Sequence, residues 1–206
     1  MKRLYLLRHG QTEFNVKKLV QGRCDSPLTV LGRQQARAAA AWLKAHGVVP
    51  DKVVSSPLGR SMDTASLVAT ELLSPDAAVE PCEGIIERSY GTFEEGPHDA
   101  LPTDVWDPGE DLIPFGGEGS HALQERMVAT LTNLMSAKDT ETLLAVSHGS
   151  ASRQFIKAAA PEGFELPAKL PNCAIMIFDF DDAREEDDTL QCKFTLQQIV
   201  DPQQSH

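Results

Sequence analysis

Short apolar runs alternate along this chain with longer segments in which apolar and polar residues recur at helical spacing. The apolar runs of strand length lie at residues 2–7, 52–55, 77–82, 142–147, 174–180 and 190–200. The segments with helical patterns lie at residues 29–46, 58–73, 120–137 and 150–159. Strands and helices that alternate in this order build a parallel sheet covered on both faces. The pattern therefore predicts an α/β fold, a three-layer αβα sandwich whose largely parallel central sheet carries an antiparallel edge strand.

Local signals mark the ends of two of these helices. Thr29 stands where the 29–46 helix begins, and its hydroxyl is suited to accept from free backbone N–H groups. Gly47 follows the same helix and is suited to end it. Ser120 is the candidate cap of the 120–137 helix.

Two segments depart from the alternating pattern. Residues 89–119 are rich in Gly, Pro and Asp and are too long for a plain connector, so we expect a lid inserted over an active site. The acidic run at residues 181–188 is typical of a solvated hairpin loop between the last two strands. The chain has no internal repeat, and residues 1–206 are predicted to form a single domain that contains the lid.

Composition narrows the classes of partner and compartment. A net charge of −11 makes nucleic acids and anionic membranes poor partners. The 4 cysteines and 6 histidines lack the close spacing of disulfide-rich or metal-binding sequences, so we expect reduced thiols and no metal site. The apolar run before Arg8 is too short for a signal peptide, and no run reaches membrane-spanning length. A cytoplasmic location is expected, and the oligomeric state stays open.

The first apolar run leads directly into Arg8, His9 and Gly10. Arginine offers a planar fork of donors that matches phosphate oxygens, and histidine is a nucleophile that is neutral near pH 7. Glycine allows the backbone to turn closely against a ligand. The triplet indicates a phosphate site with a nucleophile in it, although a chance match with a surface histidine is the alternative for these three residues alone.

Further polar residues fall where the same pocket would lie. His148 and Gly149 follow the 142–147 strand, and ligands in such sheets bind beyond the carboxyl ends of the strands. The helix that begins just after His148 would attract an anion through its free N–H groups. Arg60 lies in the first turn of the 58–73 helix, where its charge opposes the helix dipole and a bound phosphate would remove that penalty.

Together these segments resemble the histidine phosphatase superfamily, in its phosphoglycerate-mutase-like branch. The matching segments are residues 8–15, 21–32, 56–65 and 85–96, in the family's order. The resemblance extends from Leu6 to about Phe180. Asp63 departs from the pattern, because the family more often has Gln there. An acidic residue at this position would either weaken anion binding or pair with a nearby arginine.

The resemblance implies a role for each matching residue. His9 is the nucleophile that forms a phosphohistidine, and Glu87 is the proton donor. Arg8, Arg60 and a protonated His148 complete the catalytic set by neutralising phosphate oxygens. The implied substrate-binding residues are Arg8, Asn15, Gln21, Gly22, Arg60, Glu87, His148, Gly149 and Asn172. No metal and no cofactor is implied, because cationic side chains take the role that a metal would play.

The role of Glu87 rests on these motifs alone, and two further histidines are expected to lie outside the site. Without them, Glu87 would be interpreted as a surface carboxylate paired with Arg88. His98 and His121 are expected to be exposed loop or helix-start residues outside the pocket.

Phosphatases and mutases of this family share the same motifs, so the choice depends on charge elsewhere. Between Ser89 and Glu125 the chain has no Lys or Arg and 9 carboxylates, which disfavours a second anionic group. We therefore expect a phosphomonoesterase that acts on a small phosphorylated metabolite with a neutral or cationic leaving group. The alternatives are a phosphoglycerate mutase that depends on 2,3-bisphosphoglycerate, because residues 87–91 resemble the mutase motif, and a non-catalytic phospho-ligand-binding member.

Overall fold

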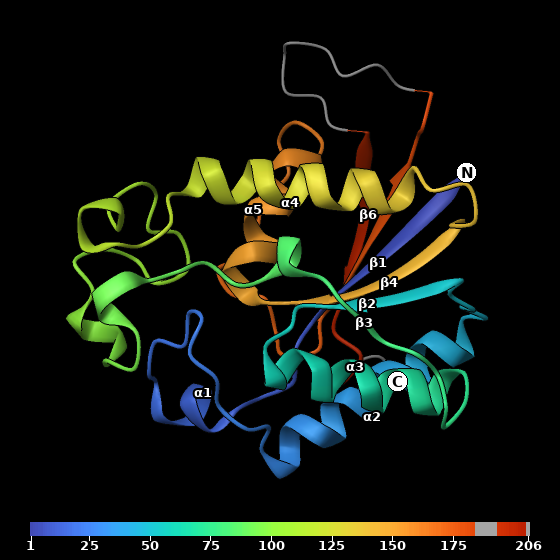
Figure 1. Ribbon diagram of the computed structural model, residues 1–206, viewed down its shortest axis with the longest axis horizontal. Coiled ribbons are helices and arrows are strands. Elements are labelled where there is room, and N and C mark those ends of the chain that lie inside the picture. Colours follow the sequence, from blue (N-terminus) through green and yellow to red (C-terminus); the bar gives the residue numbers. More distant parts are fainter. Residues whose placement is uncertain (184–192, 205–206) are drawn as a thin grey trace.

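A computed structural model describes residues 1–183 and 193–204 (Figure 1). Its centre is a 6-stranded sheet in the order β3-β2-β4-β1-β5-β6. The strands are β1 (Lys2–Arg8), β2 (Lys52–Ser55), β3 (Glu80–Pro81), β4 (Thr142–Ser147), β5 (Ile175–Phe180) and β6 (Phe194–Val200). The four strands β1 to β4 pair in parallel, whereas β5 pairs antiparallel with both β1 and β6. The predicted α/β fold, with antiparallel pairing at one end of the sheet, is confirmed.

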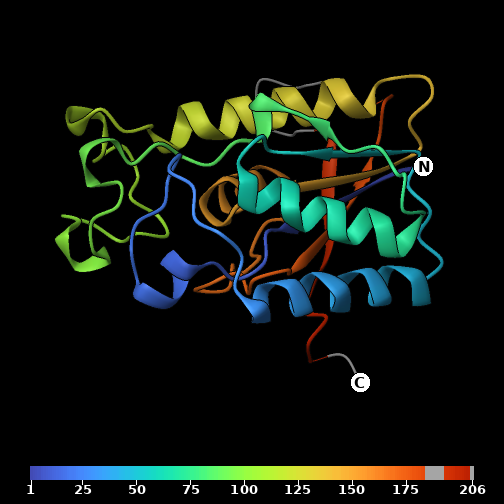
Figure 2. The same cartoon turned by 60° about the horizontal axis from the view of Figure 1, so that its bottom comes forward.

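Helices cover both faces of this sheet (Figures 1 and 2). One face carries α2 (Val30–Ala45) and α3 (Gly59–Leu72), and the other carries α4 (Ser120–Met135) and α5 (Gly149–Ala159). Side chains alternate along a strand, so β1 serves both faces. Its Leu4 and Leu6 pack in the core under α4 and α5, and its Tyr5 and Leu7 pack in the core under α2 and α3. The three predicted layers follow from this alternation.

The predicted element ends agree in part with the structure. Thr29 caps α2 as expected, since its hydroxyl accepts from the Gly32 N–H at 3.0 Å. Gly47 adopts a left-handed φ of 68° just beyond α2, which a residue without a side chain reaches at little cost. The predicted cap of α4 is wrong: Gly119 is the N-cap, and the Ser120 hydroxyl instead accepts from the Arg88 guanidinium.

The remaining differences lie in short or irregular segments. The strand expected over residues 77–82 is reduced to β3, and one short helix, α1 (Glu13–Lys17), was not predicted. Thr12 and Asn15 form a capping box around α1, which stabilises 5 residues that are too few to show helical periodicity. Most of the acidic run, from residue 184 onward, lies outside the described residues.

Long loops gather at the carboxyl ends of the parallel strands. The segment after β1 and the predicted lid, residues 89–119, lie together at this end of the molecule (Figures 1 and 2). They are joined by backbone hydrogen bonds, in which the Val20 N–H donates to Gly96 and the Glu95 N–H donates to Val20, both at 2.8 Å. Three single turns of 3₁₀ helix, Gly91–Phe93, His98–Ala100 and Ile113–Phe115, shape the lid. Among the described residues, none of the helices has the length and apolar character to cross a bilayer.

Candidate active site

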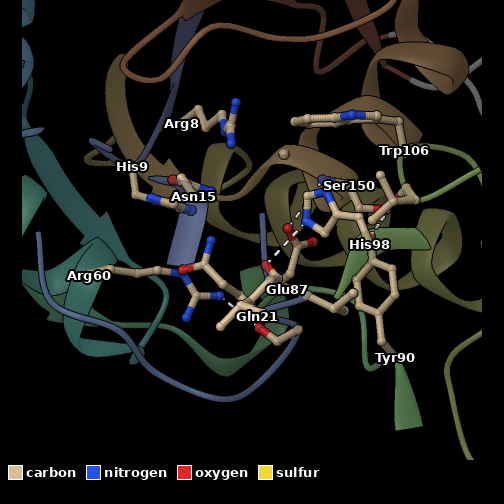
Figure 3. Close-up of a pocket in the computed structure, with 15 residues that line it drawn as sticks. Arg8, His9, Asn15, Gln21, Arg60, Glu87, Tyr90, His98, Trp106 and Ser150 are labelled. Atoms are coloured by element: carbon tan, nitrogen blue, oxygen red, sulfur yellow. Dashed lines mark hydrogen bonds between the residues drawn. The ribbon is translucent and has the colours of Figure 1, made fainter. Parts of the chain in front are cut away.

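A pocket lies where the two loop segments meet the ends of β1 and β4 (Figure 3). Its wall is formed by Arg8, His9, Asn15, Leu19, Val20, Gln21, Gly22, Arg60, Glu87, Tyr90, His98, Val105, Trp106, Gly149 and Ser150. Eight of the ten predicted site residues, Glu87 among them, therefore line one pocket, whereas His148 and Asn172 are not part of its wall. No group of three or more His, Cys, Asp or Glu side chains is placed to hold a metal ion in the part of the chain that the structure describes.

The orientation of the His9 ring is fixed by a hydrogen bond to its own neighbour. Its Nδ1 lies 2.7 Å from the Gly10 carbonyl oxygen, so Nδ1 donates and Nε2 keeps a free lone pair. Only 2% of the residue is exposed. Burial, and then the nearby charges of Arg60 and Arg8, lower the pKa of His9 well below its ordinary value. The imidazole is consequently neutral and nucleophilic at physiological pH.

Three residues near the His9 ring each have a buried side-chain nitrogen without a hydrogen-bond partner among the described residues. These nitrogens are Arg8 Nε, Arg60 Nε and His148 Nδ1. The His148 ring lies 5.2 Å from the His9 ring, and its Nε2 lies 2.7 Å from the Ser56 hydroxyl. When that hydroxyl donates to Nε2, the proton of the neutral ring is on Nδ1. Buried N–H donors of this kind are suited to bind phosphoryl oxygens.

The charge state of His148 in the ligand-free protein follows from its surroundings. Burial, Arg60, His9 and Arg8 lower the pKa of His148 well below its ordinary value, so the ligand-free ring is neutral rather than protonated. A neutral ring still donates through Nδ1. Burial also lowers the pKa of Arg8 to about 10, and this guanidinium stays charged at neutral pH.

The loop after α1 holds Arg60 in place. The Arg60 guanidinium donates to the Cys24 carbonyl at 2.6 Å and to the Gly22 carbonyl at 2.7 Å. The Asp25 carboxylate accepts from the Gly59 N–H at 2.6 Å and the Arg60 N–H at 3.2 Å, at the N-terminus of α3. Asp25 therefore offsets the unfavourable dipole that was expected to require a bound phosphate.

We expect Asp25→Ala to lower the free energy of unfolding by about 1 kcal/mol, the usual cost of losing a helix cap. It should also raise KM for a phosphate ester several-fold, because Arg60 loses part of its support. The matched control is Asp63→Ala on the same helix, whose carboxylate pairs with Arg33 at 3.8 Å where both side chains are about half exposed. Urea unfolding and steady-state kinetics measure both effects. Equal behaviour of the two variants would contradict the role of Asp25.

Glu87 occupies the N-terminus of α5. Its carboxylate accepts from the backbone N–H groups of Arg88 at 2.8 Å, Ala151 at 2.9 Å and Ser150 at 3.2 Å. The anion at this helix end is thus a side chain of the protein, and not the substrate as predicted. The alternative of a surface pair with Arg88 is wrong, because Glu87 is 8% exposed and the buried Arg88 guanidinium donates elsewhere.

The other predicted contacts divide into two groups. Asn15, Gln21, Gly22 and Gly149 line the pocket. Asn172 does not: its amide donates to the His9 carbonyl at 3.1 Å and to Asn15 Oδ1 at 3.3 Å, behind the nucleophile. Because the Asn15 oxygen is used in this way, its NH₂ group is left as the donor toward the pocket.

Residues of the predicted lid add a wall that the motifs did not indicate. Tyr90, Val105 and Trp106 line the pocket, with the Trp106 ring 5.0 Å from the guanidinium carbon of Arg8. His98 also lines the pocket, so its expected place outside was wrong, whereas His121 is exposed and lies 3.5 Å from Glu125. Isolated apolar residues in an irregular segment carry no periodic signal that could have identified them.

The lid carboxylates do not face the pocket as an acidic surface. Glu94 accepts from the Cys24 and Tyr90 N–H groups, and Glu118 pairs with Arg126 at 2.8 Å. Asp107 pairs with Lys157 on α5 at 2.6 Å. These carboxylates fasten the lid to its surroundings, so they give no support to a cationic leaving group.

The two buried neutral histidines predict how stability depends on pH. Each has a lowered pKa in the folded chain, so between pH 7 and 5 the unfolded chain binds more protons and unfolding becomes easier as pH falls. Each contributes up to about 1.4 kcal/mol per pH unit below about pH 6.5. Urea unfolding from pH 7 to 5 should give a shallower slope for His148→Ala than for the parent. His121→Ala, at an exposed histidine, should keep the parent slope, and a parallel slope for His148→Ala would contradict the assignment.

Comparisons with known proteins agree with this geometry. The family model for the histidine phosphatase superfamily (branch 1) matches residues 4–192. The chain is 33% identical to a probable phosphoglycerate mutase GpmB of Proteus mirabilis over 189 residues, which cover 87% of this chain and 86% of that protein. A phosphoserine phosphatase of Entamoeba histolytica, solved with phosphoserine, has a TM-score of 0.74 and 27% identity, with 98% of each chain covered. A phosphoglycerate mutase of Bacillus anthracis shares the fold, with a TM-score of 0.79, 20% identity, and 98% of this chain and 94% of that one covered. The chain belongs to the histidine phosphatase superfamily, branch 1.

Proposed function

We propose that the protein is a phosphomonoesterase that hydrolyses small phosphorylated metabolites through a phosphohistidine on His9. The observation that carries this proposal is the shared position of His9, Arg8 and Arg60 in one pocket wall with His148 beside them, where Arg8, Arg60 and His148 each keep a buried nitrogen without a partner in the described part of the chain. The donors match the charge of a phosphoryl group, and Nε2 is the atom that can attack its phosphorus.

In the first step, the Nε2 lone pair of His9 forms a bond to phosphorus while the bond from phosphorus to the ester oxygen breaks. Glu87 gives a proton to that oxygen, so the leaving group departs as an alcohol. Arg8, Arg60 and His148 hold the three equatorial oxygens during the transfer, and Asn15 adds a neutral donor.

In the second step, Glu87 takes a proton from a water molecule whose oxygen attacks the phosphohistidine. The bond from nitrogen to phosphorus breaks, and its electron pair returns to His9. The products are inorganic phosphate and the free enzyme. The sum of the two steps is the hydrolysis of one ester by one water molecule.

The competing function is a phosphoglycerate mutase, which relatives named GpmB favour by their names. The phosphoserine phosphatase neighbour favours hydrolysis by its name. A mutase must hold a second anionic group, and among the described residues that line the pocket the only Lys or Arg side chains are Arg8 and Arg60. Both lie beside His9 in the proposed phosphoryl site, so no further cation of the described wall is left for a second anionic group, which supports hydrolysis.

A paired assay without added metal tests this proposal. One arm follows phosphate release from small phosphate esters, and the other follows interconversion of 3- and 2-phosphoglycerate with bisphosphoglycerate present. We expect hydrolysis to dominate and acid-labile phosphohistidine to form during turnover. Efficient interconversion with slow hydrolysis would establish a mutase instead, and the absence of phosphohistidine with either substrate would establish a non-catalytic binding protein.

A further inference from the structure

The pocket has a second half that the proposed chemistry does not use. In Figure 3, Arg8, His9, Asn15 and Arg60 lie on one side, whereas Tyr90, His98 and Trp106 lie on the other, with Glu87 between them. In the proposed mechanism Glu87 protonates the leaving group. Because Glu87 lies between the two halves, the leaving group would occupy the side opposite His9. We define this side as the leaving-group subsite, formed by Leu19, Val20, Tyr90, His98, Val105 and Trp106.

Two polar groups of this subsite, the Tyr90 hydroxyl and one ring nitrogen of His98, are already paired. The Tyr90 hydroxyl donates to the Val105 carbonyl at 2.7 Å, and His98 Nε2 lies 3.2 Å from the Leu19 carbonyl. Burial is the main cause that lowers the pKa of His98, so its ring brings no positive charge at neutral pH. The surface offered to a leaving group is therefore mainly apolar and aromatic, and its remaining polar side-chain atoms are the Trp106 indole nitrogen and His98 Nδ1.

A small hydrophobic core beneath the subsite supports its wall. Val20 and Tyr90 are buried together with Leu101 and Leu112 in a small core separate from those of the sheet. Val105 packs against the same core. A wall supported in this way keeps its shape when a ligand binds. The ligand therefore meets a preformed apolar surface that does not rearrange around it.

Trp106 joins the subsite to the phosphate position. Its ring lies 5.0 Å from the guanidinium carbon of Arg8, and a Cβ on Gly149 would lie 2.8 Å from the ring. The next residue, Asp107, anchors this segment to α5 by accepting from Gln154 at 3.0 Å and Lys157 at 2.6 Å. The indole is thereby held where the group next to the phosphate would contact it.

Arg88 and Arg126, next to the lid, are paired elsewhere, whereas Lys18 and Lys169 lie near His98 but do not line the pocket. The Arg88 guanidinium donates to Ser150, Glu118 and Ser120, and the Arg126 guanidinium pairs with Glu118 and donates to two carbonyl groups. Within the described ranges, no cation other than Arg8 and Arg60 lines the pocket. A carboxylate or second phosphate on the leaving group would therefore be desolvated without a partner.

We propose that the leaving-group subsite binds an uncharged apolar or aromatic leaving group, with Trp106 as the residue that determines this specificity. The inference rests on the proposed phosphomonoesterase activity and narrows its substrates. Neutral polar leaving groups would gain less from this wall, and anionic ones would be disfavoured.

Three primary alkyl phosphates with comparable leaving alkoxides test the proposal: 2-phenylethyl phosphate, glycerol 3-phosphate and 3-phosphoglycerate. We expect kcat/KM to be at least about tenfold higher for the phenylethyl ester than for the glycerol ester, and lowest for phosphoglycerate. Trp106→Ala should reduce the phenylethyl-to-glycerol ratio by about tenfold, whereas Trp106→Phe should keep most of it. Trp42→Ala, on the far side of the sheet, is the matched control and should leave the ratio unchanged.

The outcomes separate this inference from the proposed function. A parent enzyme that hydrolyses all three esters equally, or phosphoglycerate fastest, overturns the apolar subsite but leaves the phosphomonoesterase in place. Hydrolysis of none of them by the parent overturns the proposed function as well. Because the parent's ranking is measured first, the inference can be rejected even where Trp106→Ala does not fold.

Discussion

His9→Ala is expected to reduce phosphate release by about 10³-fold or more and to abolish the phosphohistidine. The substitution removes the atom that bonds to phosphorus, and no other described residue in the pocket presents a neutral imidazole with a free lone pair toward the three donors. Rapid acid-free quenching with a labelled ester, followed by detection of phosphohistidine, measures the intermediate directly. Steady-state phosphate release measures the rate.

The same variant should still bind an anion. Arg8, Arg60 and His148 keep their positions without the His9 ring, because their hydrogen bonds go to other groups. Phosphate or vanadate binding by calorimetry should therefore survive, which distinguishes lost chemistry from lost folding. His121→Ala should retain parent activity as a control. Activity of His9→Ala within tenfold of the parent would exclude His9 as the nucleophile.

The residues proposed for phosphoryl transfer could be identified from the sequence because each lies at the end or the start of an element with a clear pattern. His9 follows a buried strand, Arg60 begins a helix, and His148 lies between β4 and α5. Parallel strands place their carboxyl ends at one edge, so these residues meet without any tertiary information. The order and type of the long elements could be predicted for the same reason.

The parts that could not be predicted depend on contacts between irregular segments. Asp25 supports α3 from a loop 34 residues earlier in the chain, which no local spacing indicates. Glu94 and Glu118 look like surface charge in the sequence, yet they fasten the lid to Cys24 and Arg126. The residues around Trp106 show neither strand nor helix periodicity. Its position over Arg8 therefore follows only from the folded lid.

The N-termini of α3 and α5 show how such long-range contacts change a prediction made from the sequence. Sequence reasoning assigned both to substrate phosphate, but α3 is capped by Asp25 and α5 by Glu87. In the proposed mechanism the substrate anion is therefore held by side-chain donors and not by helix ends. Glu87 gains a fixed orientation from α5, which suits the proton exchange proposed for it.

Glu87→Gln is expected to lower kcat for alkyl phosphates by about 10²- to 10⁴-fold, the usual range for a lost general acid. The amide oxygen can still accept from Arg88 and Ala151, while the contact to Ser150 is lost, so the fold should be retained with a modest cost in stability. The effect must depend on the leaving group. An ester of p-nitrophenol releases a weakly basic phenolate that departs without a proton, so its first step should be much less affected.

This difference has a kinetic signature. With p-nitrophenyl phosphate, Glu87→Gln should release nitrophenolate in a burst of about one equivalent per site and then stall, because the second step still needs the carboxylate as a base. Phosphohistidine should accumulate on His9 during the stall, and an alkyl ester should show no burst. Glu118→Gln, which weakens the pair with Arg126 outside the pocket wall, is the matched control and should affect both esters by the same factor. An equal loss on both esters for Glu87→Gln, without a burst, would assign Glu87 to the support of α5 and require another proton donor.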